Sequence, residues 1–153
     1  RIMAATLTDH GVDDGSQVGP LLDQIDGPLA AFMGDGAYDQ TGVTAALAEH
    51  TPDAAVIVPP RSTAVPSAAA ETNPTQRDQH LQSIAEHGRR AWQKASRYTV
   101  RALVEAFFSR WKRVIGDGSR FRTDDRRTTE ITIAVRTLNR MLDLGRPDSV
   151  RVA

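Results

Sequence analysis

The feature that most constrains the fold is the alternation of short apolar runs with helical patterns in the first part of the chain. Apolar, partly β-branched runs of this length are typical of buried strands. The expected strands cover residues 2–7, 29–33 and 54–58, and the expected helices cover residues 16–25 and 40–50. Because strands joined by helical crossovers pair in parallel, the sequence predicts an α/β layer built on a parallel sheet.

The second part of the chain breaks this alternation. It contains a stretch rich in Pro, Ser, Thr and Ala, which is typical of an exposed loop, followed by a polar segment with helical character. We treat both as an insertion into the α/β layer. The expected segments are an insertion over residues 60–97, with its loop at 60–76, a helix over 98–116 and a last helix over 124–144.

The predicted helix over residues 98–116 has two distinct faces. Four polar residues share one face by their spacing: Tyr98, Arg101, Glu105 and Lys112. An apolar stripe at three-and-four spacing is typical of a helix docked on a core. The stripe is formed by Val104, Phe107, Phe108, Trp111 and Ile115. Arg101 stands four residues before Glu105, so a simple ion pair between them is one reading of this face.

The formal net charge of zero conceals two oppositely charged halves. Residues 1–86 carry three Lys or Arg against twelve Asp or Glu, and residues 87–153 carry sixteen against seven. A basic half with two tryptophans fits a nucleic-acid binder, whereas two solvated faces that attract each other explain the charges equally well. There is no cysteine, and no apolar run approaches the roughly 18 residues of a membrane span. We therefore expect a cytoplasmic protein without a membrane partner.

One carboxylate stands out by its position. Asp35 follows an apolar run and lies between two glycines, at the strand end where α/β folds place ligand contacts. A Gly-Asp-Gly turn without further role is the simpler alternative. Asp35 and Glu105 together could supply two oxygen ligands to a pair of divalent metals, and Mg²⁺ prefers such ligands. The four histidines show no metal-ligand spacing and are expected at the surface: His10, His50, His80 and His87.

The spacing Tyr-x2-Arg-x3-Glu-x6-Lys resembles the signature around the third acidic residue of DDE transposases of insertion sequences, in the group that includes the IS4 and IS5 families. Three longer phrases resemble the IS5 branch in particular. They are GDGAYD at 34–39, VIVPPR at 56–61 and RWKRVIGD at 110–117. The resemblance covers nearly the whole chain.

The resemblance implies a ribonuclease H-like fold with three acidic residues that bind two Mg²⁺ or Mn²⁺ ions. By motif, Asp35 corresponds to the second acid and Glu105 to the third, and both are implied as catalytic residues and metal ligands. The partners implied are the terminal inverted repeats, the target DNA and a second copy in a homodimer. The residues implied to contact DNA are Tyr98, Arg101 and Lys112, with Arg110 and Arg113 beside them.

No Asp in this sequence matches the first acid of the family, which stands on an earlier strand. Because the chain opens on Arg1 in strand-like sequence, we expect an amino-terminally truncated domain over residues 1–153 that is inactive alone and poorly soluble. Two alternatives stay open: a DNA-binding remnant without catalysis, and an unrelated α/β domain with an accidental motif.

Overall fold

The computed structural model describes residues 1–116 and 118–145. Asp117, the last residue of the phrase RWKRVIGD, and residues 146–153 of the expected domain lie outside the described residues. The first part of the chain forms η1 (Asp14–Gln17), α1 (Val18–Leu22), β1 (Ala31–Met33), η2 (Gly36–Tyr38), α2 (Thr41–His50) and β2 (Ala55–Ile57). The second part forms α3 (Gln76–His87), α4 (Arg89–Ala95), η3 (Tyr98–Arg101), α5 (Ala102–Val114) and α6 (Asp124–Asp143).

Two strands form a parallel sheet, as the alternation of strands and helices predicted. Ala31, Phe32 and Met33 of β1 pair with Ala55, Val56 and Ile57 of β2. Helices α1 and α2 pack side by side and supply the main buried cluster. Its fully buried members are Val18, Leu22, Val43 and Leu47, and Phe32 and Val56 of the strands pack against them. Burial of these apolar side chains holds the α/β layer together.

The predicted strand over residues 2–7 is wrong. This segment is extended but joins no strand among the described residues. Instead, the side-chain amide of Asn139 in α6 accepts a hydrogen bond from the backbone N–H of Ile2 at 2.8 Å and donates one to its carbonyl at 2.9 Å. One amide thereby satisfies both backbone groups that a neighbouring strand would otherwise bond.

The insertion covers the outer edge of β2. Gln76 donates to the Ala54 carbonyl and accepts from the Val56 N–H, both at 2.9 Å. The carbonyl of Val56 lies 2.8 Å from Nε2 of His80. Side chains of α3 thus bond the backbone groups that an exposed edge strand would present to another chain. The expectation that His80 is a surface residue is wrong, because it is partly buried between β2 and α4.

The polar segment predicted to have helical character forms two helices, α3 and α4. Thr75 and Asp78 form a capping box that starts α3, and α3 ends at Gly88, whose positive φ of 81° favours glycine. The indole of Trp92 in α4 is buried and donates to Nδ1 of His80 at 3.0 Å. Trp92 is therefore the main apolar anchor of the insertion.

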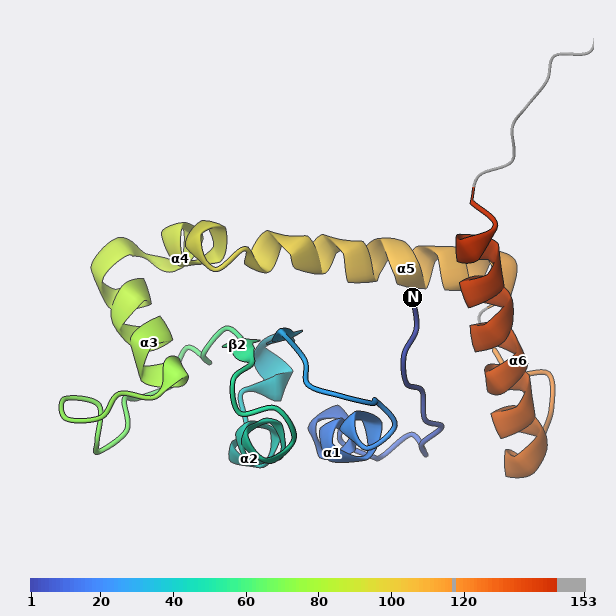
Figure 1. Ribbon diagram of the computed structural model, residues 1–153, viewed down its shortest axis with the longest axis horizontal. Coiled ribbons are helices and arrows are strands. Elements are labelled where there is room, and N and C mark those ends of the chain that lie inside the picture. The colour runs from blue at the N-terminus through green and yellow to red at the C-terminus, as the bar shows by residue number, and fades with distance from the viewer. Residues whose placement is uncertain (117, 146–153) are drawn as a thin grey trace, which may run out of the picture.

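Residues 98–116 do not form one continuous helix. Residues 98–101 form the 3₁₀ turn η3, and α5 begins only at Ala102. Figure 1 shows α5 extending away from α4 towards α6, well beyond the small sheet. The prediction that the apolar stripe docks on a core is wrong. Val104 and Phe108 are 48% and 56% exposed, and no residue of α5 is fully buried. A sheet of two strands is too narrow to cover the length of this helix.

The last helix agrees with the sequence prediction to within one residue. Ala134 and Leu138 are buried on the apolar face of α6, whereas Met141 and Leu142 of the same predicted face are exposed. In the part of the chain that the structure describes, no helix has the length and apolar character needed to cross a membrane.

Candidate functional site

Asp35 lies directly beyond β1, where the chain turns into η2. Its Oδ1 accepts a hydrogen bond of 2.9 Å from the backbone N–H of Ala37, so the side chain caps the 3₁₀ turn. Its second oxygen, Oδ2, takes no part in this cap. The simpler alternative, a Gly-Asp-Gly turn, therefore accounts for Oδ1 of this carboxylate. It does not account for Oδ2, which accepts from Arg101.

The glycine before Asp35 is required by close packing, not by a positive φ. A Cβ on Gly34 would lie 2.9 Å from Cδ2 and 3.1 Å from Cβ of Tyr38. The Tyr38 ring meets Phe32 edge to face, with 5.9 Å between the ring centroids. Packing of this ring against the strand end fixes the path of the chain through Asp35.

The surroundings of this strand end are acidic. Burial raises the pKa of the Tyr38 hydroxyl above its ordinary value, and the nearby carboxylates of Asp14, Asp35 and Asp13 raise it further. Asp13 caps η1 and accepts from the Gln40 side chain at 3.3 Å, which holds η1 beside η2. Carboxylates from two elements thus gather near one edge, an arrangement that attracts cations.

Arg101 joins the two predicted acidic residues. Its Nη2 donates to Oδ2 of Asp35 at 3.3 Å, and its Nη1 donates to Oε1 of Glu105 at 3.1 Å. The pair with Glu105 confirms the contact that their spacing on a helix predicted. Since both contacts involve terminal nitrogens of one planar guanidinium, the two carboxylate oxygens lie within about 9 Å of each other. Arg101, which stands 66 positions after Asp35 in the sequence, therefore brings the two acidic residues together.

The site offers carboxylate oxygens of the kind that a hard divalent cation binds, from two residues. Asp35 and Glu105 offer carboxylate oxygens, and their side chains are 43% and 69% exposed, so water and a phosphate could complete a coordination shell. Within residues 1–116 and 118–145, no group of three or more His, Cys, Asp or Glu side chains is placed to hold a metal. Mg²⁺ is often held by only one or two carboxylates together with substrate phosphates.

The other residues predicted to contact DNA lie apart from the carboxylates. The Tyr98 ring lies against Trp92, with centroids 5.6 Å apart, and so packs on the insertion. Lys112 and Arg113 are exposed in the last turn of α5, and Arg110 is partly exposed one turn earlier. None of the four contacts Asp35 or Glu105 in the described parts of the chain. Of the four residues predicted to share one face, Tyr98 and Arg101 lie in η3 and Glu105 and Lys112 lie in α5, and Arg101 and Glu105 contact each other.

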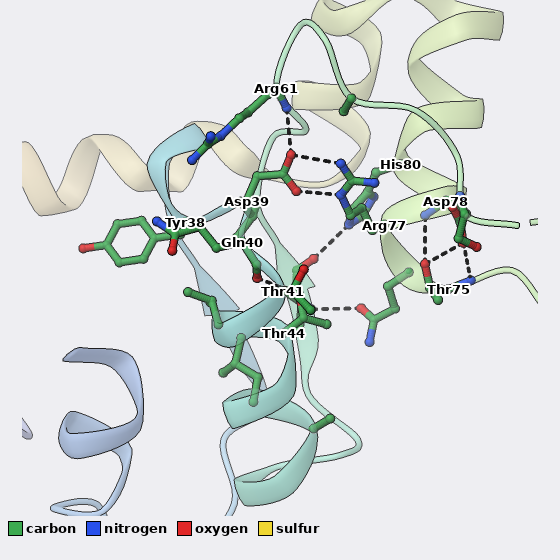
Figure 2. Close-up of a pocket in the computed structure, with 18 of the residues that line it drawn as sticks. Tyr38, Asp39, Gln40, Thr41, Thr44, Arg61, Thr75, Arg77, Asp78 and His80 are labelled. Atoms are coloured by element: carbon green, nitrogen blue, oxygen red, sulfur yellow. Dashed lines mark hydrogen bonds and ion pairs between the residues drawn. The ribbon is translucent and has the colours of Figure 1, made fainter. Parts of the chain in front are cut away.

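Sequence reasoning missed a partly buried ion pair between Asp39 and Arg77. Asp39 ends the phrase GDGAYD, and its side chain is only 6% exposed. It accepts from Nε of Arg77 at 2.6 Å and from the backbone N–H of Arg61 at 2.9 Å (Figure 2). Burial alone would raise the pKa of Asp39, but the hydrogen bonds from Arg77 and Arg61 lower it below its ordinary value. This pair ties η2 to the insertion, and no local spacing indicated it.

A cavity of about 640 Å³ lies between α2, β2 and the insertion (Figure 2). Asp39, Arg61 and Arg77 contribute to its polar wall, and side chains of α2 form an apolar wall. Neither Asp35 nor Glu105 lines it. The cavity is therefore separate from the candidate cation site.

Arg101 thus joins a strand-end carboxylate to a helix carboxylate at a partly exposed place on the molecule. A family model described as the transposase DDE domain matches residues 1–141, and the chain belongs to this family. The match includes Asp35, Arg101 and Glu105. Proteins of this family are enzymes that cleave and join DNA during transposition, and they generally use a divalent metal. No solved structure matches the chain.

Proposed function

We propose that this chain contributes the second and third acidic residues to the catalytic domain of a DDE transposase of the IS5-like branch, with a ribonuclease H-like fold. Asp35 and Glu105 are the proposed catalytic residues and metal ligands. The observation that carries the proposal is their convergence on one guanidinium, from a strand end and from the first turn of a helix. The parallel pairing of β1 with β2 supports this fold.

In the proposed reaction, Asp35 and Glu105 would hold Mg²⁺ or Mn²⁺, and the bound metal would supply activation of the attacking oxygen and stabilisation of the leaving one in hydrolysis at the transposon end and in strand transfer. Asp35 holds its ligand oxygen in place because its other oxygen is fixed by the Ala37 N–H. Glu105 stands in the first turn of α5 and accepts a hydrogen bond from Nη1 of Arg101, which holds its carboxylate towards Asp35. Both carboxylates are thus oriented before any substrate arrives.

The basic residues of α5 supply the proposed contacts with DNA. Lys112 and Arg113 are exposed, and Arg110 is partly exposed, so their charges can reach backbone phosphates. Arg101, beside the carboxylates, and Tyr98, on the insertion, complete the proposed set. The partners proposed are the terminal inverted repeats and target DNA in the bacterial cytoplasm, bound by a homodimer.

One observation favours a second function, DNA binding without catalysis. No third acidic ligand joins Asp35 and Glu105 in the part of the chain that the structure describes. A chain with two ligands can still bind phosphates through α5 while it fails to assemble a two-metal centre. Such a protein would bind transposon ends and compete with an intact enzyme.

The test is a gel assay on labelled duplexes that carry the terminal repeats of the element, with and without Mg²⁺. We expect Arg101→Ala to weaken binding, whereas Arg136→Ala, which removes an exposed charge from α6, leaves binding near the wild-type level. Nicking that is lost in Glu105→Gln and Asp35→Asn, but kept in the exposed control Glu49→Gln, would establish the catalytic role. Binding without nicking in every lane would establish the second function. Equal binding by all variants would contradict both.

A further inference from the structure

Arg101 lies between the two acidic residues and contacts one carboxylate oxygen of each. We propose that Arg101 is a positioning residue that holds Asp35 and Glu105 together in the metal-free protein and releases them when a divalent cation binds. This inference rests on the proposed function, because it assumes that the same two carboxylates are the metal ligands. It adds that the Arg101 side chain and the metal compete for the carboxylates of Asp35 and Glu105.

The contacts show why the guanidinium and a cation compete. Arg101 contacts Oδ2 of Asp35 and Oε1 of Glu105. The other oxygen of Asp35 is already bonded to the backbone of Ala37. A cation that binds Asp35 through Oδ2 competes with Arg101 for that oxygen, and a cation that binds both carboxylates would repel the guanidinium that lies between them.

Arg101 is also the main link between α5 and the strand end. Within the described residues, the larger contacts of α5 are confined to η3, and neither β1 nor η2 packs extensively against it. Without the guanidinium, the two carboxylates would repel each other across an open surface. Arg101 therefore neutralises and aligns them while no metal is present.

Release of the carboxylates gives Arg101 a second partner. Its side chain is 33% exposed, so a displaced guanidinium can turn towards solvent and meet a DNA phosphate beside the acidic residues. Binding of metal to the carboxylates then favours binding of phosphate to Arg101, and the reverse. By thermodynamic linkage, DNA raises the affinity for metal by the same factor by which metal raises the affinity for DNA.

The competition predicts the direction of a mutational effect on metal binding in the absence of DNA. In Arg101→Ala, Mn²⁺ no longer displaces a guanidinium, so we expect Mn²⁺ to bind about two- to tenfold more tightly, as loss of two exposed ion pairs implies. Arg101→Lys keeps the charge but cannot contact both carboxylates as a planar fork does, so its affinity should fall in between. A purely structural role predicts the opposite sign for Arg101→Ala, because the ligands would lose their alignment.

The experiment measures free Mn²⁺ by electron paramagnetic resonance during titration of the 153-residue chain at physiological salt. Arg136→Ala is the matched control, since it removes an exposed positive charge from α6 without touching either carboxylate, and we expect less than a twofold change. Circular dichroism checks that each variant keeps its helices. Mn²⁺ binding that is unchanged or weaker in Arg101→Ala than in the wild type would overturn the proposal.

Two further arms separate this proposal from the one on which it rests. Asp35→Asn and Glu105→Gln should each weaken Mn²⁺ binding severely, and if neither does, the proposed metal site itself is wrong. If both do while Arg101→Ala has no effect, only the competition is wrong. Titration in the presence of a short DNA duplex should raise the Mn²⁺ affinity more in the wild type than in Arg101→Ala, and equal increases would contradict the coupling.

Discussion

At the scale of single residues, the strand end shows how one turn serves both packing and chemistry. Asp35 uses one carboxylate oxygen for the backbone of η2 and the other for Arg101. Gly34, immediately before it, allows the Tyr38 ring to lie directly against the chain. The position of the carboxylate therefore depends on a residue that has no side chain of its own.

Replacement of Gly34 by alanine tests this packing. The added Cβ would lie 2.9 Å from the Tyr38 ring and 3.1 Å from its Cβ, so the ring or the strand end must move. We expect Gly34→Ala to lower the free energy of unfolding by about 1 to 3 kcal/mol, measured by urea denaturation. The control is Gly42→Ala in α2, where a Cβ meets nothing within 4 Å and should stabilise by up to about 1 kcal/mol. A neutral Gly34→Ala would show that the ring packs loosely.

At the scale of elements, α3 organises the insertion through its first turn. Asp78 is buried and accepts from the backbone N–H and the hydroxyl of Ser67 at 2.7 and 2.8 Å, and from the Thr75 hydroxyl at 2.7 Å. The hydrogen bond from the Ser67 backbone, followed by those from Thr75, lowers the pKa of Asp78 well below its usual range. One carboxylate thus closes the loop of residues 60–76 onto α3.

This carboxylate predicts a specific loss of stability in acid. Because the pKa of Asp78 is lower in the folded chain than in the unfolded chain, its contribution is complete above about pH 4 and is lost as the pH falls towards the folded value. We expect the wild type to lose stability below about pH 4, and Asp78→Asn to be less stable at neutral pH with a flatter dependence in acid. Urea denaturation at several pH values measures both.

The control for this prediction removes an exposed carboxylate from the same loop. Glu71→Gln should leave the stability at neutral pH unchanged, since its side chain lies at the surface. If Asp78→Asn and the wild type lose stability with the same slope below pH 4, Asp78 is not the group that makes the insertion sensitive to acid.

At the scale of the whole molecule, the α/β layer buries its apolar side chains, whereas the long helix α5 leaves much of its apolar face exposed. The layer has its own buried cluster, and side chains of α3 cover the edge of β2. Helix α5 instead presents Leu103, Val104 and Phe108 to solvent. An exposed apolar face of this kind promotes association between copies of the chain.

Phe108→Lys tests whether this face causes association. We expect the wild-type chain to sediment with an apparent mass that rises with concentration, and Phe108→Lys to reduce that rise, because it places a charge in the apolar stripe. Ser109→Lys adds the same charge at the neighbouring exposed position outside the stripe and should change sedimentation less. A monomeric wild type at all concentrations would contradict the expectation of poor solubility.

Local patterns in the sequence determined most elements of the chain. The periods of two and of about 3.6 residues, and the stop signals at Gly and Pro, indicated the strands at Ala31–Met33 and Ala55–Ile57 and the helices α2 and α6. The spacing of Arg101 and Glu105 predicted their ion pair. These features depend on neighbours in sequence, which is why a pattern could show them.

Only the tertiary structure decided how distant residues meet. The contact of Arg101 with Asp35, the partly buried pair of Asp39 with Arg77 and the Asn139 amide on Ile2 each join residues far apart in the chain. It also decided that the apolar stripe of α5 is exposed, because burial depends on what other elements can reach. A periodic sequence shows which face of a helix is apolar, whereas the presence of a partner for that face depends on the packing of the whole chain.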